Sequence, residues 1–262
     1  MIKIFFGILL LCGTTVALEG PDFMLTNRIY SADDRHFSLL RQPTDNYNFD
    51  LTFEDASLYG LSPLKWNFVG ARFDYGAASL SICYRTYGIN DLYESPTFSV
   101  YAQKGLKRIF WIGAGLSRRD LRYGDDLYRT AQNMLLLGGG IKFARIDLAA
   151  LIENSSILSK SLYSEKTEGL ITASWLVQET LTFSLSVYSD RRHHQRIALG
   201  QYLGLTDQLA INAGLLSDPE IFFAGFEFIY RGFILGYTYY DIGGLPDCSK
   251  LTLAYRQGPS GR

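Results

Sequence analysis

The best candidates for catalytic residues in this sequence are two adjacent histidines. His193 and His194 follow Ser189 and Asp190 in a polar stretch, and an acid–imidazole pair of this kind could activate water for hydrolysis. A solvated basic loop would carry the same residue types, because surface connections are generally polar. The sequence favours the loop, and we predict a protein that is not an enzyme, with no catalytic residue.

Metal and cofactor sites have little support in the residue pattern. The chain after its first segment keeps only Cys83 and Cys248, which are far apart and belong to no Cys-x-x-Cys or Cys/His cluster. One disulfide between them is conceivable in an oxidising compartment. The glycines at 138–140 lie within an expected strand and not in a turn leading to a helix, so they do not predict a phosphate-binding loop. They are better suited to bending or to a close contact. No metal and no cofactor are predicted.

Composition limits the classes of protein that remain. The chain has 262 residues, 19% of them charged and 15% aromatic, with a net charge of -1. Such a chain is too apolar for intrinsic disorder and carries no field that would attract a nucleic acid. Its mean hydropathy is only +0.02 despite many Tyr and Phe residues. Bulky apolar side chains are therefore diluted almost evenly by polar ones.

The N-terminus has the pattern of an export signal. Lys3 precedes an apolar run at 4–11, and Thr15-Val16-Ala17 offers small residues at the two positions read by a signal peptidase. We expect a cleaved signal at 1–17. The run is too short for the alternative of a membrane anchor, which needs about 20 residues.

The elements that follow are strands. From residue 50 onward, apolar and polar residues alternate with period two, as in Leu181, Phe183, Leu185 and Val187 against the residues between them. The alternation and the turn residues predict fourteen strands. They are expected at 50–57, 66–74, 78–87, 97–104, 107–118, 131–143, 145–153, 168–177, 180–189, 195–204, 207–216, 220–230, 232–241 and 249–257.

Connections between these strands are alternately short and long. Tight turns such as Arg231-Gly232 alternate with longer polar stretches such as 154–167. Transmembrane β-barrels have this rhythm, with short periplasmic turns, longer external loops and strands of about ten residues. A soluble barrel or sandwich would show the same alternation with its faces reversed, and the export signal and loop rhythm argue against it. We predict an all-β, closed antiparallel transmembrane barrel of about 14 strands at 49–257, an N-terminal segment at 18–48 that could plug the lumen, and a tail at 258–262.

Aromatic side chains at strand ends fit the girdles that flank the apolar band of such a barrel. We expect these girdles to include Tyr75, Tyr84, Tyr87, Tyr101, Phe143, Trp175, Tyr188, Tyr202, Tyr230, Tyr239, Tyr240 and Tyr255.

Charged residues on the polar strand faces are the candidate lumen lining, because an Arg or Lys facing lipid costs about 2–4 kcal/mol at midplane. They could select a solute by charge, or form a structural network that fills a narrow lumen. The presence of both signs favours the network. The candidates are Arg72, Arg85, Arg145, Asp147, Glu153, Glu227, Lys250 and Arg256.

The last hairpin, residues 236–256, resembles the closing hairpin of the PorV/PorQ outer-membrane proteins, within the wider group similar to the fatty acid transporter FadL. The resemblance implies a fourteen-stranded barrel with an N-terminal segment folded into its lumen. Two features depart from the family pattern. The expected Asn-Pro-Ala signature is absent, the nearest proline context being Arg41-Gln42-Pro43-Thr44, and Gln257 stands where a terminal aromatic residue is usual.

The functional expectation follows from the barrel and the resemblance together. We expect a protein of the bacterial outer membrane, in contact with its lipid, acting as a channel- or transporter-like barrel for small or hydrophobic solutes. The alternative is a PorV/PorQ-like structural or secretion-associated barrel that acts through secretion-machinery proteins. Either way, no nucleic acid is an expected partner.

Overall fold

The computed structural model describes residues 48–58, 61–89, 92–106, 109–124, 128–154, 167–189, 195–217, 220–242 and 248–257. The expected signal at 1–17, the segment at 18–48 apart from Asn48, the histidine pair with Asp190, and the tail at 258–262 lie outside these residues.

All regular elements of the described chain are strands. They are β1 (Asn48–Leu58), β2 (Leu61–Tyr75), β3 (Ala78–Ile89), β4 (Tyr93–Glu94), β5 (Thr97–Leu106), β6 (Phe110–Tyr123), β7 (Tyr128–Phe143), β8 (Ile146–Asn154), β9 (Thr167–Gln178), β10 (Leu181–Ser189), β11 (Gln195–Gly204), β12 (Leu209–Leu216), β13 (Ile221–Tyr230), β14 (Phe233–Ile242) and β15 (Cys248–Gln257). In this part of the chain, no helix is long and apolar enough to span a membrane.

β4 and β5 form one wall strand with an interruption. Both pair with β3 on one side and β6 on the other. The interruption falls at Ser95 and Pro96, and proline lacks the N–H that a ladder bond would need. The carbonyl of Pro96 still accepts a bond from the Asp120 N–H at 2.9 Å, and the Ser95 N–H donates to Tyr87 at 2.7 Å. Fourteen wall strands result, as predicted.

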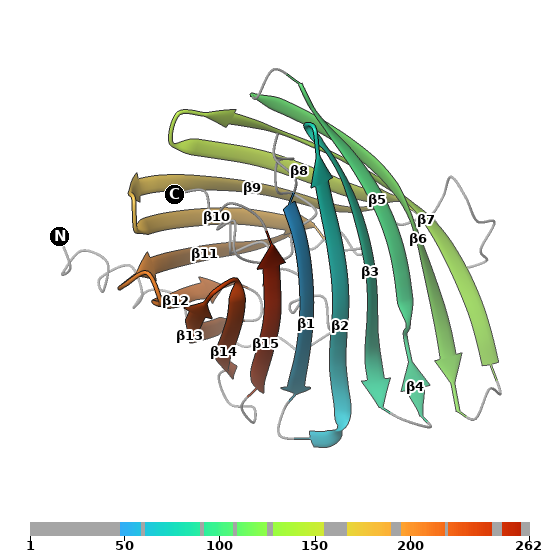
Figure 1. Cartoon of the computed structure of the whole chain (residues 1–262). Helices are drawn as coiled ribbons and strands as arrows, with labels where there is room; N and C mark the ends of the chain where they lie inside the picture. The colour runs from blue at the N-terminus through green and yellow to red at the C-terminus, as the bar shows by residue number, and fades with distance from the viewer. Residues whose placement is uncertain are drawn as a thin grey trace.

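The strands close into a barrel (Figure 1). Each pairs antiparallel with its neighbours in the sequence, and β1 pairs with β2 on one side and with β15 on the other, from Phe49↔Gln257 to Ser57↔Ser249. The predicted closed antiparallel barrel is confirmed.

Tight hairpins gather at one end of the barrel. Gly76 and Ala77 between β2 and β3 both have positive φ, and so do Arg231 and Gly232 between β13 and β14. Two consecutive positive φ angles define the type I′ turn, whose twist matches that of the flanking strands. We call this the turn end, and the opposite one the loop end.

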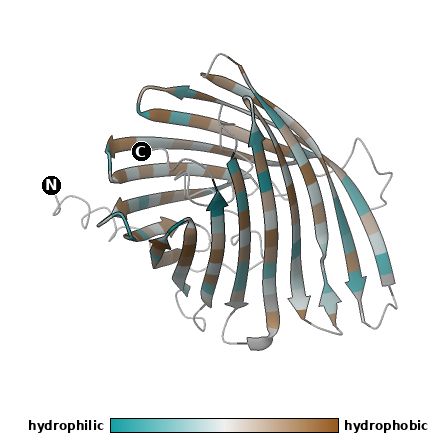
Figure 2. Cartoon of the chain, in the orientation of Figure 1, coloured by the Kyte–Doolittle hydropathy of each residue, from teal (hydrophilic) through white to brown (hydrophobic). Residues whose placement is uncertain are grey.

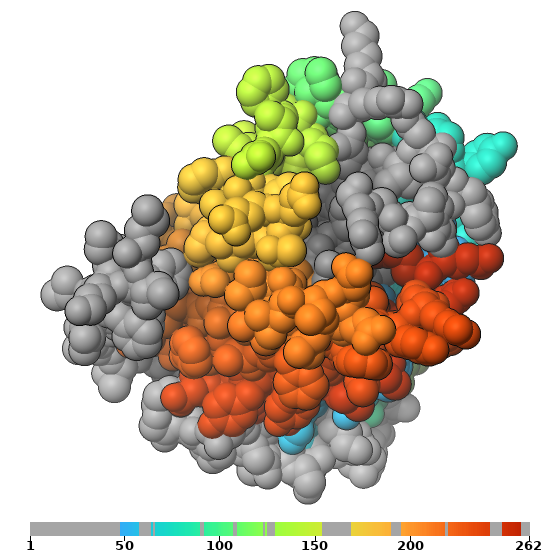
Figure 3. All heavy atoms as spheres, turned by 60° about the vertical axis from the view of Figure 1, so that its left-hand side comes forward, coloured from blue at the N-terminus to red at the C-terminus, as the bar shows by residue number. Residues whose placement is uncertain are grey.

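The two faces of the wall differ in kind. Large apolar side chains such as Leu199, Ile211 and Leu253 are 40–46% exposed on the outer face, while residues that alternate with them are buried on the inner face. Figure 2 shows the resulting banding along the strands, and in Figure 3 β9 to β14 follow one another as a continuous outer wall. An apolar outside around a polar inside is the reverse of a soluble barrel, and it places the chain in a bacterial outer membrane.

Exposed aromatic residues form the expected girdle most clearly at the turn end. Tyr75, Phe143, Trp175, Tyr230 and Phe233 are 49–77% exposed there.

Five of the twelve predicted girdle residues are wrong. Tyr101, Tyr188, Tyr202 and Tyr240 are at most 6% exposed, and Tyr87 is half-buried against the apolar cluster on the inner wall. They share the inner face with polar residues such as Gln103. The position of a residue along the strand sets its height in the membrane, but its odd or even place in the alternation decides which face of the wall it lies on. These five tyrosines pack inside the barrel.

Glycines of β6 and β7 make room for one of these inner tyrosines. A Cβ on Gly113 would lie 2.5 Å from the Tyr101 ring and 2.8 Å from Gln103, and a Cβ on Gly138 would also collide with the Tyr101 hydroxyl. Tyr101 itself has no exposed area. The glycines at 138–140 are thus partly explained by a close contact within the wall.

Replacing Gly113 with alanine is expected to destabilise the barrel by about 1–3 kcal/mol, because a methyl group must displace a buried ring. Gly169→Ala is the matched control, since a Cβ there meets no atom within 4 Å and its φ is not positive. Urea unfolding in lipid vesicles measures both. Equal stability of the two variants would contradict the packing of Tyr101 against Gly113.

Candidate functional site

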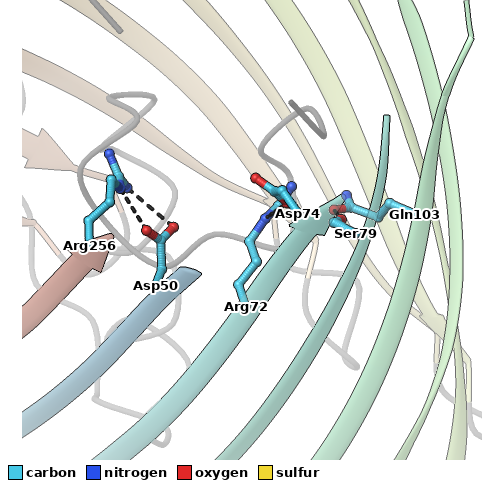
Figure 4. A network of polar contacts seen from close by, with 6 residues as sticks. All are labelled: Asp50, Arg72, Asp74, Ser79, Gln103 and Arg256. Atoms are coloured by element: carbon cyan, nitrogen blue, oxygen red, sulfur yellow. Dashed lines mark hydrogen bonds and ion pairs between the residues drawn. The ribbon is translucent and has the colours of Figure 1, made fainter. Parts of the chain in front are cut away.

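The inner wall across β15, β1 and β2 carries paired charges near the turn end (Figure 4). Arg256 at the end of β15 donates from Nε to Asp50 Oδ1 at 2.7 Å, and Arg72 of β2 donates from Nε to Asp74 Oδ1 at 2.8 Å. Asp50 stands opposite both Arg256 and Arg72 in the strand register, so the two pairs are adjacent. We call these four residues the charged network.

Polar contacts extend this network to both sides. Ser79 of β3 donates to Gln103 of β5 at 2.8 Å, next to Asp74 in the register. Further along β1, Glu54 lies 3.5 Å from Lys250 Nζ, with both side chains nearly buried. Opposite charges are thus matched pair by pair, which is what buried ions require.

Hydroxyl groups line other parts of the inner wall. Ser99 of β5 and Ser117 of β6 lie 2.8 Å apart, and Ser186 of β10 donates to Thr172 of β9 at 3.0 Å. A hydroxyl both donates and accepts, so this surface can solvate neutral and charged polar groups alike.

An apolar cluster occupies the inner wall toward the loop end. Trp66, Phe68, Ile221 and Phe223 are at most 4% exposed, and they pack with other buried residues of β1–β3 and β11–β15. Apolar side chains therefore occupy part of the inner wall near the loop end, beside the Glu54–Lys250 pair.

Seven of the eight candidate residues point to the inner face. Arg72, Lys250 and Arg256 belong to the ion pairs above, and Glu227 is 1% exposed on β13. Arg85 of β3, and Asp147 and Glu153 of β8, share the inward parity and are half-buried.

Arg145 does not lie on the inner wall. Ala144, with φ 52°, starts the turn after β7, so β8 begins at Ile146 and Arg145 becomes part of the turn. Its Nη1 donates to the Val177 carbonyl at 3.1 Å. The predicted strand began one residue too early, which made a turn residue look like a lumen residue.

The acidic partners were missed by the sequence reasoning. Asp50, Glu54 and Asp74 are all at most 3% exposed on the inner face. Asp50, Thr52, Glu54 and Ala56 alternate with Leu51, Phe53 and Asp55. This alternation could have identified the two β1 carboxylates, although not which base each one meets.

The described residues form neither a metal site nor a disulfide. Among them, no three His, Cys, Asp or Glu side chains gather in a way that could hold a metal ion. Cys83 and Cys248 are buried and form no disulfide with each other, and they lie on strands separated by β1 and β2.

Comparison with known proteins supports the architecture alone. No family model matches the chain, and no curated protein matches it in sequence. Among solved structures, the Acinetobacter baumannii outer membrane protein Omp33 is similar with a TM-score of 0.51 and 9% identity, covering 81% of this chain and 99% of that one. A mutant porin of Rh. blastica has the same coverage with a TM-score of 0.46 and 7% identity. The likeness to Omp33 is one of fold.

Proposed function

We propose that the protein is a non-enzymatic, channel-like barrel for small solutes in the outer membrane. The observation that carries the proposal is the polar inner wall, with ion pairs and hydroxyls, inside a barrel whose outer face is apolar. Charges of both signs pair with each other, so they favour neither cations nor anions strongly. A hydrophobic solute would find its matching surface in the apolar cluster toward the loop end.

A plug formed by residues 18–48 is part of this proposal. Eight strands leave an interior that wall side chains alone can fill, whereas fourteen enclose a wider one. Yet Trp66, Arg72 and Glu227 on the inner wall are each only 1% exposed. Such burial in a wide barrel supports the presence of additional chain in the lumen, and we propose the N-terminal segment for this role.

Planar-bilayer conductance tests the channel. The full chain should give small, weakly ion-selective currents, and deletion of residues 18–45 should increase the conductance because the lumen is then filled by water. Heat-dependent gel mobility serves as the folding control for the deletion variant. If neither folded protein conducted current, the proposed channel would be refuted.

A PorV/PorQ-like partner role is the second candidate. The near-complete burial of inner-wall residues such as Trp66, Arg72 and Glu227 favours it, since a sealed barrel acts through its surface. Pairing around the barrel is also continuous, which argues against sideways release of a hydrophobic solute through the wall. Crosslinking in the outer membrane followed by mass spectrometry would recover secretion-machinery proteins if this role is correct, and lipid alone if it is not.

A further inference from the structure

The outer face of the β6–β7 hairpin carries a group of charged residues at the loop end. Arg118, Asp120 and Arg122 alternate on β6, and Arg129 follows on β7 opposite Arg122. The side chains of Arg118 and Arg129 are 59% and 54% exposed. We call these four residues the arginine patch.

The patch begins where the apolar outer band ends. Ile112 and Leu116 lie on the same face of β6 and are 59% and 58% exposed, and Arg118 is the next residue on that face. Two residues of a strand cover about 6–7 Å, so the Arg118 backbone lies within one such step of the apolar surface. Guanidinium groups at this height reach the polar headgroup layer of the outer leaflet.

Asp120 holds two of the arginines side by side. Its Oδ1 accepts from Arg118 Nε at 3.2 Å, and its Oδ2 accepts from Arg129 Nη2 at 3.3 Å. One carboxylate facing two guanidinium groups leaves a net positive charge. The neighbouring Arg122 and Glu94 are 3.9 Å apart and both well exposed, a pair that contributes little by itself.

The outer face near the loop end carries charge of the opposite sign on other described strands. On the same outer face, Asp55 of β1 and Asp241 of β14 carry negative charge toward the loop end. An anionic headgroup would be repelled there and attracted at β6–β7. Guanidinium groups suit phosphate in particular, because their N–H groups form a fork that matches two phosphate oxygens.

We propose that the arginine patch binds the phosphate groups of the phosphorylated glycolipid in the outer leaflet. Arg118 and Arg129, which flank Asp120, bind one headgroup through their positive charges, and Leu116 together with Phe98, which is 48% exposed on β5, contacts the acyl chains below it. The site lies on the outside of the barrel and is independent of what passes through the lumen.

Retention of lipid A by the purified full chain tests the proposal. Native mass spectrometry in detergent would compare bisphosphorylated lipid A with its dephosphorylated form. Wild type should retain the bisphosphorylated lipid preferentially, and the double variant Arg118→Gln/Arg129→Gln should bind it roughly 30-fold more weakly. This factor assumes that each arginine contributes about 1 kcal/mol and that about 1.4 kcal/mol changes the affinity tenfold. The matched control, Lys104→Gln/Arg231→Gln, removes two positive charges at the turn end and should bind as wild type does.

A second variant separates binding from a structural role. Asp120→Asn leaves both arginines and removes their counter-charge, so it should retain the phosphorylated lipid at least as well as wild type. Loss of binding in this variant would refute the proposal, as would equal retention of both lipids by wild type or an equal loss in the turn-end control. Displacement of the lipid by inorganic phosphate at equimolar concentration would also refute it, because the site would then be one for free phosphate.

Discussion

Arginine in place of Leu185 is expected to destabilise the folded barrel by about 2–4 kcal/mol, the cost of a cationic side chain at the bilayer midplane. Leu185 is at the centre of β10, 44% exposed, between the outward residues Ala173 and Leu199 of the adjacent strands. On a soluble protein, the same change at an exposed position would cost within about 0.5 kcal/mol. Urea unfolding in phospholipid vesicles measures the difference.

Tyr75→Arg supplies the control for depth in the membrane. Tyr75 is 77% exposed at the turn end, where an arginine reaches water and should cost only about 0–1 kcal/mol. If both variants lost the same stability, or if neither lost any, the apolar band would not be in contact with hydrocarbon.

Removing Arg72 alone should destabilise the barrel by about 3–5 kcal/mol, because the substitution leaves the carboxylate of Asp74 buried without its cation. Both side chains of this pair have no exposed area. Arg72→Met is the test variant, and the shift in its urea midpoint is the measurement.

The double variant Arg72→Met/Asp74→Leu should recover most of that loss, since apolar side chains of similar volume often replace a buried ion pair at little cost. Asp50 contacts Arg256 at 2.7 Å, so its charge should stay paired in either variant. If the double variant lost as much unfolding free energy as Arg72→Met and Asp74→Leu lose in sum, Arg72 and Asp74 would contribute independently. That result would contradict the charged network.

Period-two alternation predicted where the wall strands lie but not all of their ends, since β6 continues to Tyr123 and β7 begins at Tyr128. The segment expected at 180–189 is Leu181–Ser189 in the structure, and even the short expectation at 50–57 falls within Asn48–Leu58. The interruption at Pro96 was not foreseen, because β4 has only two residues, too few to show any alternation.

The charged network could be predicted only in part. Parity places Arg72, Lys250 and Arg256 on the inner face, and the structure shows them there. Which acid meets which base depends on the register between strands, and the pair of Asp50 and Arg256 joins residues 206 apart in sequence. The glycine contacts with Tyr101 were missed for the same reason, since they cross from β5 to β6 and β7.

The β1–β15 seam determines when assembly can finish. Because Phe49 pairs with Gln257, the first and last strands must both be present before the ladder is complete. Until then, the chain has two open edges, whose unpaired backbone groups each cost several kcal/mol in hydrocarbon. Pairings this distant in sequence also form slowly. A nascent chain of this protein must therefore be kept from aggregating in water until the residues of β15 have crossed the inner membrane.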